Sequence, residues 1–227
     1  VAFDPRLDWT VGRDEVPYKD WGNHEASWIR APAFGGLYSP KKTAYEDASG
    51  AVSNVGWVPT QTSSMNIHIY RYADLLLLLA EAYVEEGQLE NARAIVNDIR
   101  VRAAARAQGP NGGPIAVPID DAGITWADYQ IGQYTAPWTD QTAAMTRVRY
   151  ERRLELSMEG ERFFDLRRWG TAPQVLNTYL AAEVRRLPHL AAAATFADRH
   201  ALYPLPTLQI ELSQENGEQT LVQNTGW

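Results

Sequence analysis

Three glutamates, Glu151, Glu155 and Glu159, recur every fourth residue and have the types and spacing most suggestive of chemistry. On a helix this spacing places their carboxylates on one face, and paired carboxylates are the acid/base groups of glycoside hydrolases. Arginines stand three or four residues from these glutamates, at Arg147, Arg152 and Arg162. Neighbouring cations keep carboxylates ionised, whereas a general acid must hold its proton. We therefore favour an arginine–glutamate network that pins a bent helix against the core over a catalytic pair.

The apolar residues of the same segment indicate how it would pack. Tyr150, Leu154 and Met158 also recur every fourth residue and predict the apolar stripe of a helix over 141–159. Gly160 is suited to end that helix, because glycine accepts the left-handed conformation of a helix cap.

Aromatic residues are dense in the N-terminal region 1–66, which prolines and glycines make mostly irregular. A flat indole or phenol ring matches the C–H face of a sugar, and neighbouring polar side chains match the sugar hydroxyls. The residues that best fit such a platform are Trp9, Tyr18, Trp21, Asn23 and Trp28. Aromatic rings also bury a large area and hold loops onto a core, so packing is the alternative role for each of them.

Composition argues against several classes of function. The formal net charge of −7 argues against binding of nucleic acid or anionic lipid, because both need a basic surface. The chain has no cysteine, which excludes disulfides, thiolate catalysis and cysteine-based zinc sites. Its four histidines lack the i, i+4 pairing of a helical metal site, and we expect no cofactor. Asp120 and Asp121 could hold calcium, although adjacent loop acids are more often solvated.

Two consecutive segments have the pattern of a helical hairpin. A helix over 71–86 is predicted from the helical spacing of Tyr72, Leu75, Leu76, Leu79 and Tyr83. Leu77, Leu78 and Ala82 extend its apolar surface, so we expect this helix to be buried on most sides. The inner stripe predicted for a helix over 89–107 consists of Leu89, Ala92, Val96, Ile99 and Ala103. Two helices joined so tightly resemble a tetratricopeptide unit, which cannot cover its own apolar faces. We expect the chain to expose apolar helix surface or to dock against another chain.

The predicted fold class is mainly α: a tetratricopeptide-like helical hairpin with further packed helices and long ordered loops. We expect a single domain over 1–227. Its parts are an aromatic-rich loop region over 1–66, the helical hairpin over 71–107, signature helices over 141–187, and an extended tail with a short helix over 188–227. Thr139 or Asp140 could cap the first signature helix.

Four stretches, in order along nearly the whole chain, resemble the SusD/RagB family of glycan-binding outer-membrane lipoproteins of the Bacteroidetes type. They are FDPRLDWTVGR at 3–13, YRYADLLLLLAEA at 70–82, ERRLELSMEGERFFDLRRWG at 151–170, and LYPLP at 202–206 with QNTGW at 223–227. Family members are about twice this length. The resemblance therefore implies the C-terminal half of such a protein, and the start at Val1 rather than Met also suggests a fragment or a processed form.

The resemblance implies non-catalytic oligosaccharide binding for nutrient uptake. The whole protein would be lipid-anchored on the extracellular face of the outer membrane and would act with a TonB-dependent transporter. Its other partner would be the N-terminal half of the same protein, or another chain. The matching signature residues have a structural role by this resemblance: Glu151, Arg152, Arg153, Glu159, Arg162, Asp165, Arg168 and Trp169. The glycan contacts of the family cannot be transferred residue by residue, so the aromatic candidates rest on local chemistry.

Two other functions stay open from the sequence. A tetratricopeptide-like hairpin could serve as a protein-interaction scaffold that holds a peptide in a groove. A glycoside hydrolase would need two carboxylates about 5–10 Å apart in one cleft and without arginine partners, and no pair in the sequence indicates this.

Overall fold

The computed structural model describes residues 1–51, 64–108, 116–122, 127–193 and 195–227. Residues 52–63 of the expected loop region 1–66 therefore lie outside the described residues. The α-helices are α1 (Arg6–Thr10), α2 (Pro32–Gly35), α3 (Tyr72–Glu85), α4 (Leu89–Ala105), α5 (Gln141–Glu155), α6 (Glu161–Arg168), α7 (Ala172–Glu183) and α8 (Thr207–Leu212). The 3-10 helices are η1 (Ala26–Trp28), η2 (Asp47–Ser49), η3 (Pro188–Ala192) and η4 (Asp198–Ala201).

Strands are short and form two-stranded antiparallel ladders in the described part of the chain. The pairs are β1 (Val11–Gly12) with β2 (Ser39–Pro40), β3 (Ala107–Gln108) with β4 (Ala116–Val117), and β5 (Gln214–Glu215) with β6 (Glu218–Gln219). The mainly α fold class is confirmed. None of the helices in the described residues is long and apolar enough to cross a membrane.

The described chain divides into two compact units, Val1–Arg162 (unit 1) and Phe163–Trp227 (unit 2). The expected single domain over 1–227 stays a prediction. In unit 2, the Asn177 side chain of α7 both donates to and accepts from the backbone of Phe196. The indole of Trp227 donates to the carbonyls of Arg199 and Leu202, which holds the end of the tail on η4.

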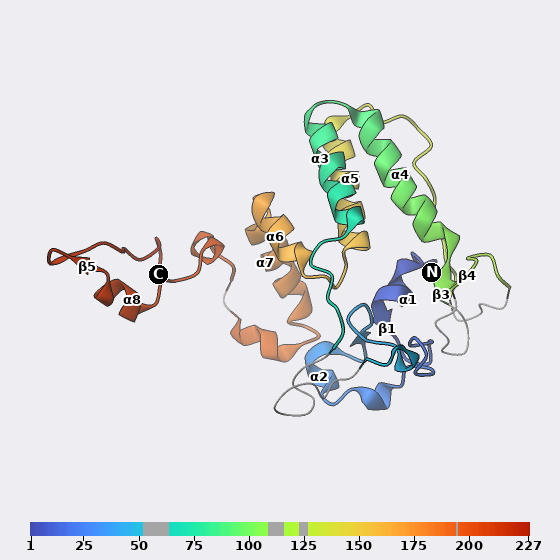
Figure 1. Cartoon of the computed structure of the whole chain (residues 1–227), viewed down its shortest axis with the longest axis horizontal. Coiled ribbons are helices and arrows are strands. Elements are labelled where there is room, and N and C mark those ends of the chain that lie inside the picture. Colours follow the sequence, from blue (N-terminus) through green and yellow to red (C-terminus); the bar gives the residue numbers. More distant parts are fainter. Residues whose placement is uncertain (52–63, 109–115, 123–126, 194) are drawn as a thin grey trace. The chain divides into compact units, whose positions relative to one another are not determined.

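Helices α3, α4 and α5 lie side by side and form the core of unit 1 (Figure 1). The buried residues of this core are Leu77, Ala80, Val84, Ala92, Val96, Ile99, Trp138, Ala144 and Val148. Most are small, which lets the helices approach closely. The Asp140 carboxylate accepts a hydrogen bond from the backbone N–H of Ala143 at 2.6 Å, so the predicted N-cap of α5 is confirmed.

The buried faces of α3 and α4 differ in how well they were predicted. The stripe predicted for α4 is confirmed, because Ala92, Val96 and Ile99 are buried. The expected burial of α3 on most sides is wrong: Tyr72 is 73% exposed and Leu75 is 61% exposed. The leucine run is apolar on every side, so its periodicity does not select a face. Packing selects the side with Leu77, Ala80 and Val84, where small residues admit two neighbouring helices.

The predicted inner stripe of α5 is also wrong. Tyr150 and Met158 are each 51% exposed, whereas Glu151 and Glu155 are buried. The helix ends at Glu155, four residues earlier than predicted, and the chain then turns through left-handed backbone at Met158 and Gly160. The glutamate face therefore points into unit 1, where cations from other elements meet it.

Candidate functional site

Glu155 accepts hydrogen bonds from three guanidinium groups. Its Oε1 accepts from Arg71 Nη1 at 3.1 Å and pairs with Arg102 Nη2 at 2.6 Å. Its Oε2 accepts from Arg6 Nη1 at 3.1 Å. The three arginines come from α1, the residue before α3, and α4, so this one carboxylate joins three elements that are distant in sequence.

Glu151, one turn earlier on α5, is fully buried and accepts from Arg6 at 2.7 Å and Arg100 at 3.0 Å. Arg152 donates to the Asp74 carboxylate on α3 at 2.7 Å. The glutamate network is defined here as Glu151, Glu155 and Glu159 with their cations Arg6, Lys42, Arg71, Arg100 and Arg102. The glutamates do meet arginines, as expected, but these cations come from elsewhere in the fold, and the structural role of the network stays a prediction.

The local arginine partners expected from spacing are wrong for two of the three positions. Arg147 lies over the rings of Tyr134 and Trp138 at 5.4 Å from each centroid, and Arg152 pairs with Asp74. Pairs at i, i+4 form on an exposed helix surface, whereas this glutamate face is turned inward.

The cations of the network lower the pKa of two of its glutamates, Glu155 and Glu159. Burial alone would raise the pKa of Glu155, but the hydrogen bonds and charges of Arg102 and Arg6 outweigh it and hold the pKa below its usual value. Burial also opposes ionisation of Glu159, and Arg71 and Lys42 lower its pKa in the same way. Neither carboxyl is therefore set up to hold a proton as a general acid.

Beside the network unit 1 has an open cleft of about 610 Å³. It is lined by α1, the 41–46 and 65–71 segments, the ends of α4 and α5, and β3. Trp9, one of the predicted platform residues, lies in its wall and is 36% exposed. The volume is within the usual range for small-molecule sites.

Two of the residues that line this cleft, Lys41 and Thr10, carry buried polar groups. Lys41 is 1% exposed, and its ammonium donates to the carbonyl oxygens of Asp8 and Pro17. Burial lowers the pKa of Lys41 to about 8 and is only partly offset by the Asp8 charge. The Thr10 hydroxyl is buried and has no hydrogen-bond partner among the described residues.

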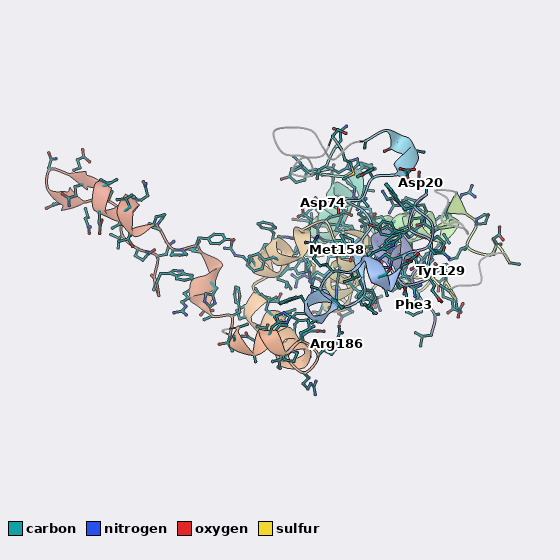
Figure 2. All side chains as sticks on the ribbon, turned by 90° about the horizontal axis from the view of Figure 1, so that it is seen from below. Phe3, Asp20, Asp74, Tyr129, Met158 and Arg186 are labelled. Carbon is teal, nitrogen blue, oxygen red and sulfur yellow. The ribbon has the colours of Figure 1, made fainter. Side chains whose placement is uncertain are left out.

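Asp8 holds in place helix α1, from which several residues line the cleft. Its carboxylate is fully buried and accepts two hydrogen bonds from Arg13, at 2.6 and 2.8 Å, and one from the Tyr129 hydroxyl. Phe3 pairs with Tyr129 through the backbone, and Figure 2 shows the two residues close together. These contacts hold α1 against the 127–130 segment and so position the residues of α1 that line the cleft.

The predicted aromatic platform residues fall into separate groups. Tyr18 contacts Trp28 edge to face with centroids 5.7 Å apart, and His24 contacts the same indole at 5.2 Å. Trp21 packs at 79° against Tyr45 and donates its indole N–H to the Tyr45 carbonyl. Because the rings of these pairs are inclined at 64–87° to each other, they do not form a coplanar stack. Trp21 and Trp28 are 43% and 44% exposed, so both retain surface for a ligand.

The remaining predicted residues lie apart from the cleft. Asn23 is exposed and pairs through its backbone with Pro17. Arg153 is exposed on α5, and Arg162 is partly buried at the end of unit 1. In unit 2, Arg168 pairs with the buried Asp165 at 2.8 Å and lies over the ring of Trp169 at 5.0 Å. Whether these positions serve structure or binding stays a prediction.

Lys41, Lys42 and Thr10 were missed from the sequence. The adjacent lysine pair after Pro40 was the available signal, but neither hydropathy nor spacing marks one lysine as buried. Arg6 and Arg71 stand within the stretches 3–13 and 70–82, so the resemblance could have drawn attention to them. The described residues contain no group of three or more His, Cys, Asp or Glu that could hold a metal ion, so calcium at Asp120 and Asp121 stays without support.

The SusD family model matches residues 1–227. The chain belongs to the SusD family. A crystal structure of a SusD superfamily protein from Bacteroides vulgatus ATCC 8482 has a TM-score of 0.58 and 23% sequence identity. That match covers 99% of this chain but 40% of the other, and at this identity it shows a shared fold. No curated protein gives a significant match. The SusD/RagB resemblance seen in the sequence is confirmed.

Proposed function

We propose that this SusD-family chain is a non-catalytic oligosaccharide-binding module that serves nutrient uptake. The observation that carries the proposal is the family match over residues 1–227, because SusD-family proteins are generally glycan-binding proteins of nutrient uptake. The binding surface would combine the cleft of unit 1 with the exposed indoles of Trp9, Trp21 and Trp28. Partly exposed rings held by neighbouring groups support this, since a ring that is already ordered loses little entropy on binding.

The state of the glutamates supports binding rather than hydrolysis. Glu155 and Glu159 line the cleft, which is where paired carboxylates of a hydrolase would stand. Each is paired with at least two cations, and both pKa values lie below the usual range. A retaining or inverting glycosidase needs one protonated carboxyl at neutral pH, which this arrangement opposes.

The proposal includes the place of action. The full-length protein would be lipid-anchored on the extracellular face of the outer membrane and would deliver oligosaccharide to a TonB-dependent transporter. The support for this is the usual character of the SusD family as surface-exposed outer-membrane lipoproteins.

A glycan array followed by calorimetric titration of each hit tests the binding function. Trp28→Ala should weaken the best glycan about tenfold, or about 1.4 kcal/mol, because stacking area is lost. Tyr203→Ala is the matched control, since Tyr203 is 87% exposed and lies in unit 2. Absence of binding to every glycan would refute the function. Binding that survives alanine at all three tryptophans would refute the aromatic surface.

The scaffold function stays a second candidate because α3 has an uncovered apolar face. Tyr72, Leu75 and Leu79 lie on this face and are 73%, 61% and 41% exposed. We propose that the N-terminal half of the same protein, or another chain, covers it. The 40% coverage of the longer SusD superfamily chain supports this proposal.

Association tests this second candidate. Sedimentation analysis of the chain with the rest of the protein, supplied separately, should show a complex that Leu75→Gln weakens. The fold of the variant should be unchanged, because Leu75 is mostly exposed. A complex of equal affinity with the variant would show that this face is not the interface.

A further inference from the structure

The described residues that line the cleft carry an excess of positive charge. Seven are cationic, and three are acidic. The cations are Arg6, Lys19, Lys41, Lys42, Arg71, Arg102 and Arg106. Two of the acids, Glu155 and Glu159, are already paired within the glutamate network, so they do not offset the other cations.

Three of the lining cations have no carboxylate partner among the described residues. Lys41 donates to two backbone carbonyls, and Lys19 donates to the carbonyl of Ala44. Arg106 is exposed at the end of α4 and forms no ion pair there. Among the described lining residues, Glu46 is the one acid outside the network. A concave surface with a surplus of one sign of charge concentrates ligands of the opposite sign.

Lys41 gives the strongest indication of an anionic ligand. Burial without an ion pair disfavours its charged form, as its lowered pKa shows. An anion in the cleft would stabilise that charge. The Arg102 side chain is 57% exposed and pairs with Glu155 through Nη2. Other N–H groups of its guanidinium can therefore donate to an oxyanion.

Thr10 and Trp9 indicate that the rest of the ligand is a sugar. Thr10 is one of the residues that line the cleft, and its buried hydroxyl has no partner among the described residues, so its hydrogen-bonding capacity is available to a ligand hydroxyl. Trp9 offers a partly exposed indole in the same wall. A flat ring beside a hydroxyl donor and a cation is the set of groups that an acidic sugar needs.

We propose that the cleft binds a saccharide that carries an oxyanion group, either the carboxylate of a uronic acid or a sulfate ester. The oxyanion lies toward Arg106, Arg102 and Lys41, and the sugar ring stacks on Trp9. This inference rests on the proposed glycan-binding function and specifies the ligand class of the cleft.

Calorimetric titration with three trisaccharides tests the inference: one of galacturonic acid, one of sulfated galactose and one of neutral galactose. The protein should bind at least one acidic trimer at least tenfold more tightly than the neutral trimer, and added salt should reduce the difference. Which acidic trimer binds distinguishes a carboxylate from a sulfate. Arg106→Gln should weaken the acidic trimer about tenfold and leave the neutral one unchanged. Arg185→Gln, an exposed arginine of unit 2, is the control and should change neither.

Thr10→Val is a second variant that separates binding from folding. It should weaken the acidic trimer without lowering the melting temperature, because the hydroxyl it removes has no protein partner among the described residues. Equal binding of acidic and neutral trimers would overturn the inference, as would equal effects of Arg106→Gln and Arg185→Gln. Trp28 is not among the residues that line the cleft. If Trp28→Ala abolishes binding and the two cleft variants do not weaken it, the inference fails while the proposed function stands. If no saccharide binds, both fail.

Discussion

Replacing Glu155 by glutamine tests whether the glutamate network is architecture. The substitution keeps the size and shape of the side chain and removes its charge. It places an amide NH₂ where guanidinium groups of Arg6, Arg71 and Arg102 now donate. At least one of these donors then faces another donor. We expect unit 1 to be markedly less stable.

The magnitude follows from the partners that remain. Breaking a buried ion pair costs about 3–5 kcal/mol when the other charge is left alone. Here Arg6 keeps Asp4 and Glu151, and Arg71 keeps Glu159. Arg102 loses its carboxylate, but it is 57% exposed, so water compensates part of the loss. We therefore expect Glu155→Gln to lower the free energy of unfolding by about 2–4 kcal/mol, which is roughly 5–15 °C in melting temperature.

Urea unfolding followed by tryptophan fluorescence and by far-ultraviolet circular dichroism measures this change. Glu86→Gln is the matched control, because Glu86 is an exposed glutamate next to the end of α3 in the same unit. It should change the free energy of unfolding by less than about 0.5 kcal/mol. If Glu155→Gln is no more destabilising than Glu86→Gln, the glutamates are not structural, and the argument against catalysis fails with them.

Three further predictions follow from other contacts. The folded-state pKa of Glu159 lies below its unfolded value. The contribution of this ionised carboxylate to stability is therefore present above about pH 4.3 and is lost as pH falls through the folded-state pKa. The difference in urea midpoint between wild type and Glu159→Gln should shrink in acid. Tyr129→Phe should cost about 1.5–3 kcal/mol in urea unfolding, because the hydroxyl donates to the buried side chain of Asp8, which also pairs with Arg13; an unchanged midpoint would contradict this. Gly12→Ala should lower the free energy of unfolding by about 1–3 kcal/mol, since the new Cβ would lie 2.6 Å from the Tyr18 ring. Because Tyr18 contacts Trp28, the substitution should also weaken glycan binding at Trp28. Wild-type stability and affinity in this variant would show that the Tyr18 ring moves freely.

The sequence was sufficient for helices α3, α4 and α5, apart from the end of α5, for the family, and for the inner face of α4. In α4 the apolar residues Ala92, Val96 and Ile99 alternate with charged ones, so one face alone can be buried. The same reasoning failed for α3, whose leucine run is apolar on all sides. There the close approach of two helices decided the face, through small residues such as Ala80.

For the glutamate network too, the sequence determined one part of the arrangement and the tertiary structure determined the other. The spacing of Glu151, Glu155 and Glu159 determined that three carboxylates would share a helix face and would need cations. Their cations come from α1, α4 and the loops before α3, and no local spacing specifies such long-range partners. The cleft, with its buried Lys41, likewise exists only where these elements meet. Local periodicity records which groups lie on one side of a helix, but the tertiary structure decides which side is turned inward and which charges meet it there.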